Sequence, residues 1–128
     1  MSVRLDENLD EQRDFARLPL SARRGLEGVI EASWAMDAAC ASVDPELWFP
    51  EKAGPTARSV LEICAACPVR KSCLASAMVG VEAGIWGGVH YQARSQARGQ
   101  IARGTDPLVV LDELLDASAA IWARGSAA

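Results

Sequence analysis

Cysteines are the residues of this chain whose type and spacing could do chemistry. The sequence contains four of them, in the pattern Cys-x23-Cys-x2-Cys-x5-Cys, and they are Cys40, Cys64, Cys67 and Cys73. Thiolates are soft ligands that bind zinc ions and iron–sulfur clusters. Because three of the four lie within ten positions of one another, the spacing predicts that the set holds one metal centre.

The spacing also bears on which metal centre this is. Structural zinc sites usually contain two tight Cys-x₂₋₄-Cys pairs, whereas only Cys64-Ala65-Ala66-Cys67 is tight here and Cys40 is remote. A cysteine followed by proline, as in Cys67-Pro68, occurs in iron–sulfur sites. The pattern favours an iron–sulfur cluster and leaves a zinc site as the open alternative.

Reduced thiols are needed for either centre, so the compartment matters. The segment from Met1 to Asp14 is polar and acidic, without the apolar core of a signal peptide. No apolar run reaches the roughly 18 residues that a membrane span requires. We therefore expect a cytoplasmic protein, in which clustered cysteines bind metal more often than they form disulfides.

Composition points to a small domain with a thin core. The chain has 128 residues, half of them apolar, but many of these are alanines and only 5% of the residues are aromatic. Alanine favours helices yet buries little surface, so a chain of this size benefits from a metal or another cross-link. Segment 68–104 has five basic residues and one acidic residue, between two acidic segments. The net charge of −4 argues against non-specific binding to nucleic acid.

The elements that must position the cysteines are predicted to be helices, because strand signals are nearly absent. The fold class that we expect is all-α, with four to five short helices organised around the cysteine-bound cluster. Gly84 is expected at the C′ position of one of these helices. The expected helical ranges are 8–17, 21–34, one that opens at Pro55 and runs through Cys64, then 69–83, 91–102 and 107–123.

Three further motifs accompany the cysteines in a fixed order. They are Leu47-Trp48-Phe49-Pro50, the run Cys64-Ala65-Ala66-Cys67-Pro68-Val69, and Gly84-Ile85-Trp86-Gly87-Gly88. Together with the cysteine spacing, this order closely resembles the WhiB-like family of actinobacterial transcription regulators. The resemblance covers residues 34–92, so that 1–33 is expected to be a helical extension and 93–128 a C-terminal helical region.

The resemblance implies a redox-responsive and nitric-oxide-responsive transcription regulator. In that family four cysteines ligate one [4Fe–4S] cluster, which makes Cys40, Cys64, Cys67 and Cys73 the implied ligands. The implied partner is the C-terminal domain of the principal sigma factor of RNA polymerase, with DNA reached through that complex. The resemblance assigns Trp86, Gly87 and Gly88 to the core of the sigma factor surface. It places Trp48, Phe49 and Pro50 either near the cluster or on that surface. A glycine pair beside a tryptophan also lets a partner backbone approach closely.

The chain departs from the family pattern after the tryptophan turn. Many members end in a compact basic tail that contacts DNA, whereas here Arg94, Arg98 and Arg103 are dispersed and the tail becomes acidic and apolar. Arg94 and Arg98 are spaced i, i+4 and could face phosphate on one side of a helix, although a solvated helix face explains them equally well. His90 is expected at the surface rather than as a ligand.

Two other functions remain open. One is a zinc-bound adaptor without redox function. The other is a thiol–disulfide oxidoreductase that uses Cys64 and Cys67 in the metal-free form, although such sites normally lie in a βαβ context that this sequence lacks. No acid–base pair, nucleophile triad or phosphate loop is recognisable, so the sequence does not predict an ordinary metabolic enzyme or a small-molecule substrate.

Overall fold

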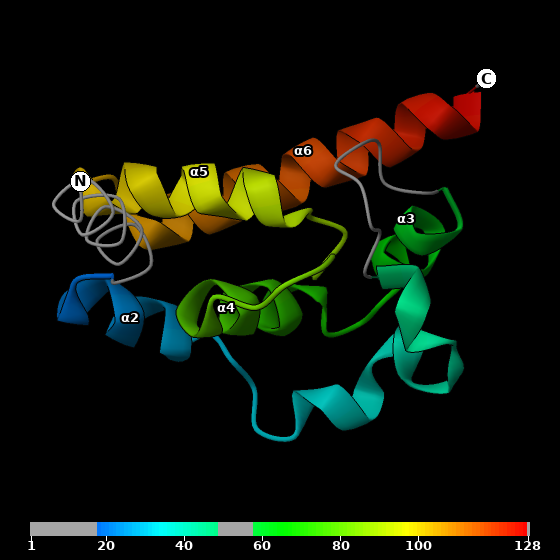
Figure 1. The fold of residues 1–128 in the computed structure, drawn as a ribbon, viewed down its shortest axis with the longest axis horizontal. Coiled ribbons are helices and arrows are strands. Elements are labelled where there is room, and N and C mark those ends of the chain that lie inside the picture. The colour runs from blue at the N-terminus through cyan, green and yellow to red at the C-terminus, as the bar shows by residue number, and fades with distance from the viewer. Residues whose placement is uncertain (1–17, 49–57, 128) are drawn as a thin grey trace, which may run out of the picture.

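The fold is all-α, as expected. The computed structural model describes residues 18–48 and 58–127, and within these ranges it contains five α-helices, three 3₁₀-helices and no strand (Figure 1). The α-helices are α2 (Leu20–Glu27), α3 (Arg58–Ala65), α4 (Arg70–Gly80), α5 (Tyr91–Ala102) and α6 (Pro107–Ala127). The 3₁₀-helices are η1 (Trp34–Asp37), η2 (Ala39–Ser42) and η3 (Pro45–Trp48).

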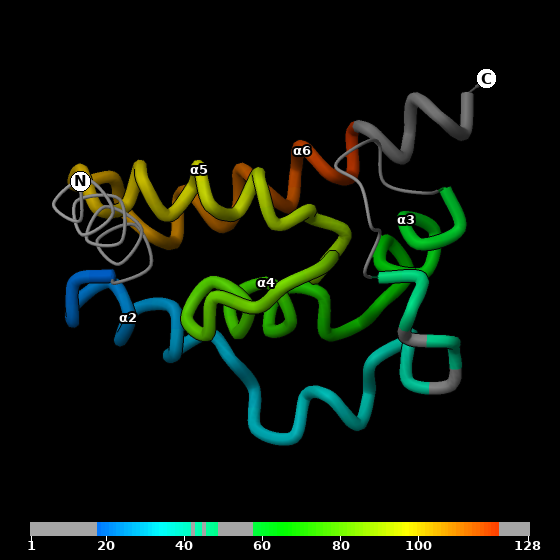
Figure 2. Tube along the Cα trace, viewed as in Figure 1, coloured from blue at the N-terminus to red at the C-terminus, as the bar shows by residue number. Residues whose placement is uncertain are grey.

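Four helices form the main body of the molecule. Helices α5 and α6 lie side by side and cover α2 and α4, with α3 at the far end of α6 (Figure 1). The connection from α2 passes below α4 through the 3₁₀-helices before it reaches α3 (Figure 2). Segments far apart in sequence are thereby brought to the α3 end of α4, where the cysteines are.

Two apolar clusters hold these elements together. The larger one lies between α2, α4, α5 and α6, and its fully buried members include Leu26, Leu74, Met78 and Leu111. Burying a side chain of this size contributes about 1.5–3 kcal/mol relative to leaving it exposed. The smaller cluster consists of Trp48, Val60, Cys64 and Ile85. The second cluster therefore contains one of the predicted ligands.

Helix α2 is shorter than the sequence suggested. We expected a helix from Ser21 to Trp34, but α2 ends at Glu27 and Pro19, not Ser21, occupies its N-cap position. Two tight turns follow, closed by hydrogen bonds from the Val29 and Ile30 amides to the carbonyls of Leu26 and Glu27. The chain then turns through Ser33, whose positive φ separates Trp34 from the helix.

Helix α4 also ends early, because its cap differs from the expected one. The left-handed position after Gly80 is taken by Val81, with φ 54°, and the amide of Glu82 donates to the Ala77 carbonyl at 3.3 Å. Gly84 does have a positive φ, but it lies in the loop beyond the helix. A β-branched residue rarely adopts this conformation, which is why the sequence pointed to the glycine instead.

The remaining helices follow the predictions closely. Helix α5 has the expected bounds, and α6 begins at Pro107 as expected and continues to Ala127. His90 occupies the N-cap position of α5, where its Nδ1 accepts a hydrogen bond from the Gln92 amide at 3.3 Å. The expected helix over 8–17 and the expected start at Pro55 lie outside the described residues.

Arg94 fixes the loop between α4 and α5 from inside. Its side chain has an exposed fraction of 0% and donates to the carbonyls of Gly84 at 2.8 Å and Val89 at 2.6 Å, and also to that of Glu82. Burial and the neighbouring Arg98 lower the pKa of Arg94 to about 10, so it stays charged at neutral pH. This one guanidinium therefore satisfies three carbonyls of the loop that carries Trp86.

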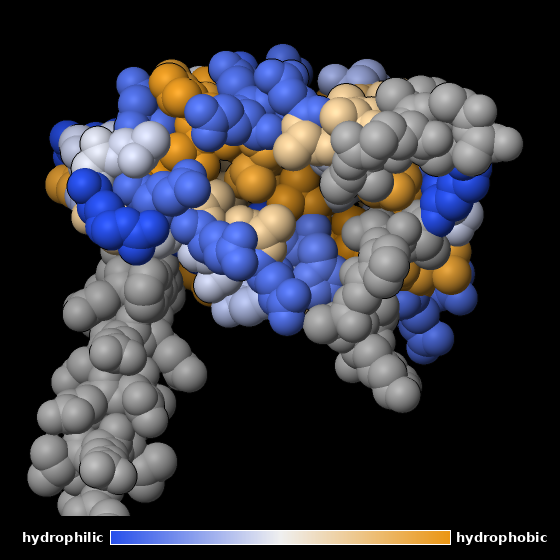
Figure 3. Space-filling model, turned by 90° about the horizontal axis from the view of Figure 1, so that it is seen from above, coloured by the Kyte–Doolittle hydropathy of each residue, from blue (hydrophilic) through white to orange (hydrophobic). Residues whose placement is uncertain are grey.

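Apolar side chains are visible between polar ones on the face seen in Figure 3. Among the residues that the structure describes, the large apolar ones with exposed side chains are Leu20, Met36, Leu47, Tyr91, Leu108 and Val109. Across the described ranges, no helix combines the length and the apolar character that crossing a membrane would require.

We expect Arg94→Met to lower the free energy of unfolding by at least about 2 kcal/mol, because it removes three hydrogen bonds to loop carbonyls and leaves those of Gly84 and Glu82 without this donor, while keeping an unbranched side chain. Arg103→Met, at an exposed position, should change it by less than about 0.5 kcal/mol. Guanidinium unfolding of both variants makes the comparison. Equal stabilities would contradict the role given to Arg94.

Candidate metal centre

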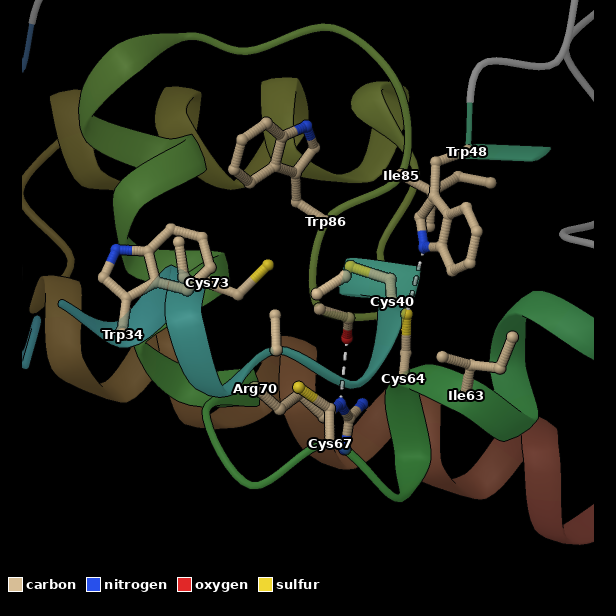
Figure 4. A pocket seen from close by; sticks show the side chains of 14 residues that line it. Trp34, Cys40, Trp48, Ile63, Cys64, Cys67, Arg70, Cys73, Ile85 and Trp86 are labelled. Atoms are coloured by element: carbon tan, nitrogen blue, oxygen red, sulfur yellow. Dashed lines mark hydrogen bonds between the residues drawn. The ribbon is translucent and has the colours of Figure 1, made fainter. Parts of the chain in front are cut away.

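The four cysteines come from three parts of the chain and line one cavity. Cys40 lies in η2, Cys64 in the last turn of α3, Cys67 in the turn that follows, and Cys73 in the first turn of α4. Their sulfur atoms face a common central space (Figure 4). The cavity has a volume of about 240 Å³. Its other lining residues, apart from Arg70, are small or apolar: Trp34, Ala35, Ala38, Ala41, Trp48, Ile63, Ile85, Trp86 and Gly87.

Local sequence explains how Cys64, Cys67 and Cys73 converge. Helix α3 ends at Ala65, and the Cys67 amide donates to the Cys64 carbonyl at 3.1 Å, which turns the chain at once. Pro68 lacks an amide hydrogen and so cannot continue the hydrogen-bonding pattern of α3. The Cys73 amide then bonds to the Val69 carbonyl at 2.9 Å as α4 begins. The break between two helices therefore places three thiols around one point.

Several N–H groups point at the cysteine sulfurs. The Trp48 indole Nε1 donates to Cys64 Sγ at 3.4 Å, and the Ala39 amide donates to Cys67 Sγ at 3.5 Å. The backbone amides of Gly88 and Gly87 also hydrogen-bond to the thiols of Cys64 and Cys73, respectively. Such donors favour the thiolate, and around a metal centre they orient the ligands and tune the metal.

Burial acts in the opposite direction on two of the thiols. It is the main reason that the pKa of Cys64 is raised and that the pKa of Cys73 is raised to about 12, and the neighbouring thiols add to it. Without a bound cation these two groups are neutral at pH 7. Four thiolates around one cavity therefore require a positively charged group among them, which a metal centre supplies.

The lining of the cavity is compatible with an iron–sulfur cluster. A tetrahedral zinc ion bound at about 2.3 Å needs sulfurs only about 3.8 Å apart. Within residues 18–48 and 58–127, no group of three or more Cys, His, Asp or Glu side chains is close enough to hold one metal ion. The same four cysteines nevertheless surround a shared cavity. Thiol donors spread around an apolar space suit a group with several irons, which separates its ligands further.

Gly87 and Gly88 allow the tryptophan turn to pack against the helices. Both have positive φ, 61° and 78°. A Cβ on Gly87 would lie 3.0 Å from the Leu74 Cβ, and a Cβ on Gly88 would lie 2.7 Å from the Ser118 Oγ. We expected the glycines to leave room for a partner, but in the structure their open sides face α4 and α6 of the chain itself.

Trp86 lies at the edge of the cavity. Its ring is half-buried, makes an edge contact with Trp34 at a centroid distance of 6.2 Å, and donates from Nε1 to the Ala83 carbonyl at 2.8 Å. Figure 4 shows both indoles on the same side of the space enclosed by the sulfurs. Trp86 is thus held in place while part of its ring remains accessible.

Trp48 is buried beside the cysteines and is not part of an outer surface. Its exposed fraction is 7%, and its indole donates to Cys64. Of the two positions expected for Trp48, near the cluster or on the sigma factor surface, the structure has the first, and its burial leaves little of the ring for a partner. Phe49 and Pro50, with the same two expected positions, lie outside the described residues.

The arginines proposed to contact DNA divide into two groups. Arg94 and Arg98 have exposed fractions of 0% and 1%, and their guanidinium carbons lie 5.8 Å and 5.4 Å from the centre of the Tyr91 ring. They are therefore not available to phosphate, which corrects that prediction: the i, i+4 spacing marks a buried pair. Arg103 is exposed, and its contact with DNA stays a prediction.

Sequence reasoning missed three residues at this site. Arg70 and Trp34 line the cavity, and Ser118 contacts the tryptophan turn from α6. Arg70 could have been noticed because it directly follows the Cys67-Pro68-Val69 run. Ser118 carried no signal, since its role depends on how α6 folds back.

Known proteins match the part of the chain that carries this site. A family model described as transcription factor WhiB matches residues 34–97, which is half of the chain. The chain belongs to the WhiB family. This confirms the resemblance seen in the motifs, and it makes the chain a WhiB-family transcriptional regulator.

Individual relatives agree with this assignment. The transcriptional regulator WhiB of Streptomyces coelicolor is 44% identical over 69 residues, which cover 53% of this chain and 78% of that protein. Transcriptional regulator WhiB2 of Bifidobacterium longum is 46% identical over 65 residues, or 50% of this chain and 65% of that protein. Transcriptional regulator WhiB1 of Mycobacterium tuberculosis is 35% identical over 75 residues, covering 55% and 89%. About half of this chain therefore lies outside each match.

The raised pKa of Cys73 predicts how the metal-free protein responds to alkali. The unfolded thiol loses its proton near pH 9, whereas the folded thiol keeps it until about pH 12. The folded state then binds more protons, so the free energy of unfolding should fall above pH 9, by at most about 1.4 kcal/mol per pH unit for this group. Guanidinium unfolding in reductant, from pH 8 to 10.5, measures this slope.

Cys73→Ser is the matched control for that measurement. Serine does not titrate in this range, so the variant should lose the part of the slope that comes from Cys73 and keep the part from Cys64. A slope identical to that of the unsubstituted chain would contradict the buried, neutral state assigned to Cys73.

Proposed function

We propose that this WhiB-family regulator holds one [4Fe–4S] cluster on Cys40, Cys64, Cys67 and Cys73 and binds the C-terminal domain of the principal sigma factor. The observation that carries the proposal is that all four thiols line one apolar cavity, with Trp86 at its edge. Oxygen and nitric oxide are the proposed signals. A cytoplasmic location and access to DNA through the sigma factor complex are part of the same proposal.

The residues around the cavity have definable tasks. The four cysteines supply thiolates, and the amides of Gly87 and Gly88 stabilise two of them through hydrogen bonds. The apolar lining limits access of water, and Arg70 places one positive charge beside the thiols. A bound cluster would add a redox-active centre that reacts with oxygen and nitric oxide.

The rim of the cavity offers a surface whose shape depends on the metal centre. Trp86 and Trp34 line the cavity and contact each other. Met36, in the same 3₁₀-helix as Trp34, has an exposed fraction of 82%. Aromatic side chains and methionine are favoured at protein interfaces. Loss of the metal centre would free the elements that hold this rim and thereby lower the affinity for a partner.

Two observations weigh against the alternative functions. A thiol–disulfide oxidoreductase needs an activated thiolate, whereas burial raises the pKa of Cys64, one member of the Cys64–Cys67 pair. Structural zinc sites usually contain two tight cysteine pairs, whereas this chain has only the pair of Cys64 and Cys67. Both observations support a cluster-binding regulator over an enzyme or a zinc adaptor.

We expect Trp86→Ala to weaken binding of the sigma factor C-terminal domain at least about tenfold, because it removes a partly exposed aromatic side chain from the rim. Iron and sulfide per chain should stay unchanged, since the four thiols remain. Anaerobic calorimetry or interferometry gives the affinity, and chemical analysis of the same sample gives the cluster content.

Leu108→Ala provides the control for this experiment. Leu108 is also a partly exposed apolar residue, but it lies in the first turn of α6 and does not line the cavity. It should bind the sigma factor domain with unchanged affinity. If Trp86→Ala keeps both its cluster and its affinity, the rim is not the sigma factor surface.

A further inference from the structure

Three hydrogen bonds of Arg70 and Ser118 connect helix α6 with the cysteine site, and two of them involve α6 directly. Arg70 Nη2 donates to the Leu115 carbonyl of α6 at 2.9 Å, while its Nε donates to the Gly87 carbonyl at 2.8 Å. The buried Ser118 hydroxyl of α6 donates to the Gly88 carbonyl at 2.9 Å. One arginine and one serine thus tie the middle of α6 to two consecutive residues of the tryptophan turn.

The same two turn residues contact the cysteines on their other side. Gly88 packs against Cys64, and Gly87 lines the same cavity as Cys64 and Cys73. A Cβ on Gly88 would lie 2.7 Å from Ser118 Oγ and 3.3 Å from Cys64 Cβ. The turn therefore lies between α6 and the thiols, so a shift of the thiols would displace the Gly87 and Gly88 carbonyls, which accept from Arg70 and Ser118.

Charge reinforces this geometry. Burial lowers the pKa of Arg70, which lines the cavity, and the nearby Cys64, Asp116 of α6 and Cys67 act in the opposite direction. Arg70 therefore lies between the cysteine site, whose cavity it lines, and α6, to which it is hydrogen-bonded through the Leu115 carbonyl.

We propose that Arg70 and Ser118 are positioning residues that couple α6 to the metal centre, so that loss of the cluster loosens the middle of α6. This inference rests on the proposed function, because it requires that a cluster be bound. The conformation of α6, like that of the cavity rim, would then depend on whether the cluster is bound. Without the cluster, α6 would become locally less stable around residues 112–120, next to the Leu115 and Ser118 contacts.

Amide hydrogen exchange of the full chain tests the coupling directly. In the unsubstituted protein, anaerobic removal of the cluster by a chelator should accelerate exchange of the 112–120 amides at least about tenfold. In Ser118→Ala the cluster-bound form should already exchange faster, so that cluster removal changes the rate by less than about threefold. The cost of this variant is one hydrogen bond, so it should still fold.

Substitutions of Arg70 separate its hydrogen bonds from its charge. Arg70→Lys keeps the charge but lacks the guanidinium fork that reaches both carbonyls, so it should lose the coupling and keep the reduction potential. Arg70→Gln removes the charge and should also shift the potential to more negative values. An anaerobic redox titration compares the reduction potentials of the two variants. If Arg70 had only a structural role, both variants would change the exchange rates and their reduction potentials would not differ.

Lys71→Gln is the matched control. Lys71 is next to Arg70 and also links α4 to α6, through an exposed ion pair with Asp112 at 3.3 Å, but that contact does not reach the turn. Exposed pairs contribute little, so this variant should behave like the unsubstituted chain in both measurements.

The outcomes separate the inference from the function on which it rests. If the protein purified without oxygen contains no iron and sulfide, the proposed function is contradicted, and so is the coupling that rests on it. A cluster-loaded chain whose α6 exchange is unaffected by cluster removal contradicts the coupling alone. Faster exchange in Lys71→Gln as large as that in Ser118→Ala would also contradict it, because any α4–α6 contact would then suffice.

Discussion

The structure depends on the convergence of four thiols around one apolar cavity. Two of these thiols are driven by burial toward the neutral form, and four thiolates can share the space only with a cationic group among them. The small cluster of Trp48, Val60, Cys64 and Ile85 contains a ligand within its own packing. A metal centre would therefore act as part of the core, and its removal would destabilise η2, α3 and α4 together.

The tryptophan turn connects this centre with the rest of the molecule. From inside, Arg94 bonds to the carbonyls of Gly84 and Val89, and this fixes the loop on which Trp86 is presented. From the helix side, Gly87 and Gly88 have no side chains, so their backbone lies between the thiols and α6. The conformation of the turn therefore depends on the cysteine site, and its Trp86 is accessible at the rim of the cavity. A signal-dependent binding surface requires both properties.

Chemistry was easier to predict from the sequence than geometry. The grouping of the four cysteines around one site, the all-α class and the bounds of α5 could be predicted from residue type, spacing and cap signals. The burial of Arg94 and Arg98 did not, because a pair at i, i+4 looks the same on a solvated face as on a face that supplies donors to loop carbonyls. Ser118 could not be found either, since its partner lies 30 residues away and is reached only through the packing of α6.

The central claim is that the four cysteines hold a four-iron cluster, and metal analysis of protein purified without oxygen tests it most directly. The account predicts close to four irons and four sulfides per chain, a broad absorption band near about 400–420 nm that bleaches in air or nitric oxide, and no zinc. One tightly held zinc with no sulfide, in protein prepared in the same way, would contradict it.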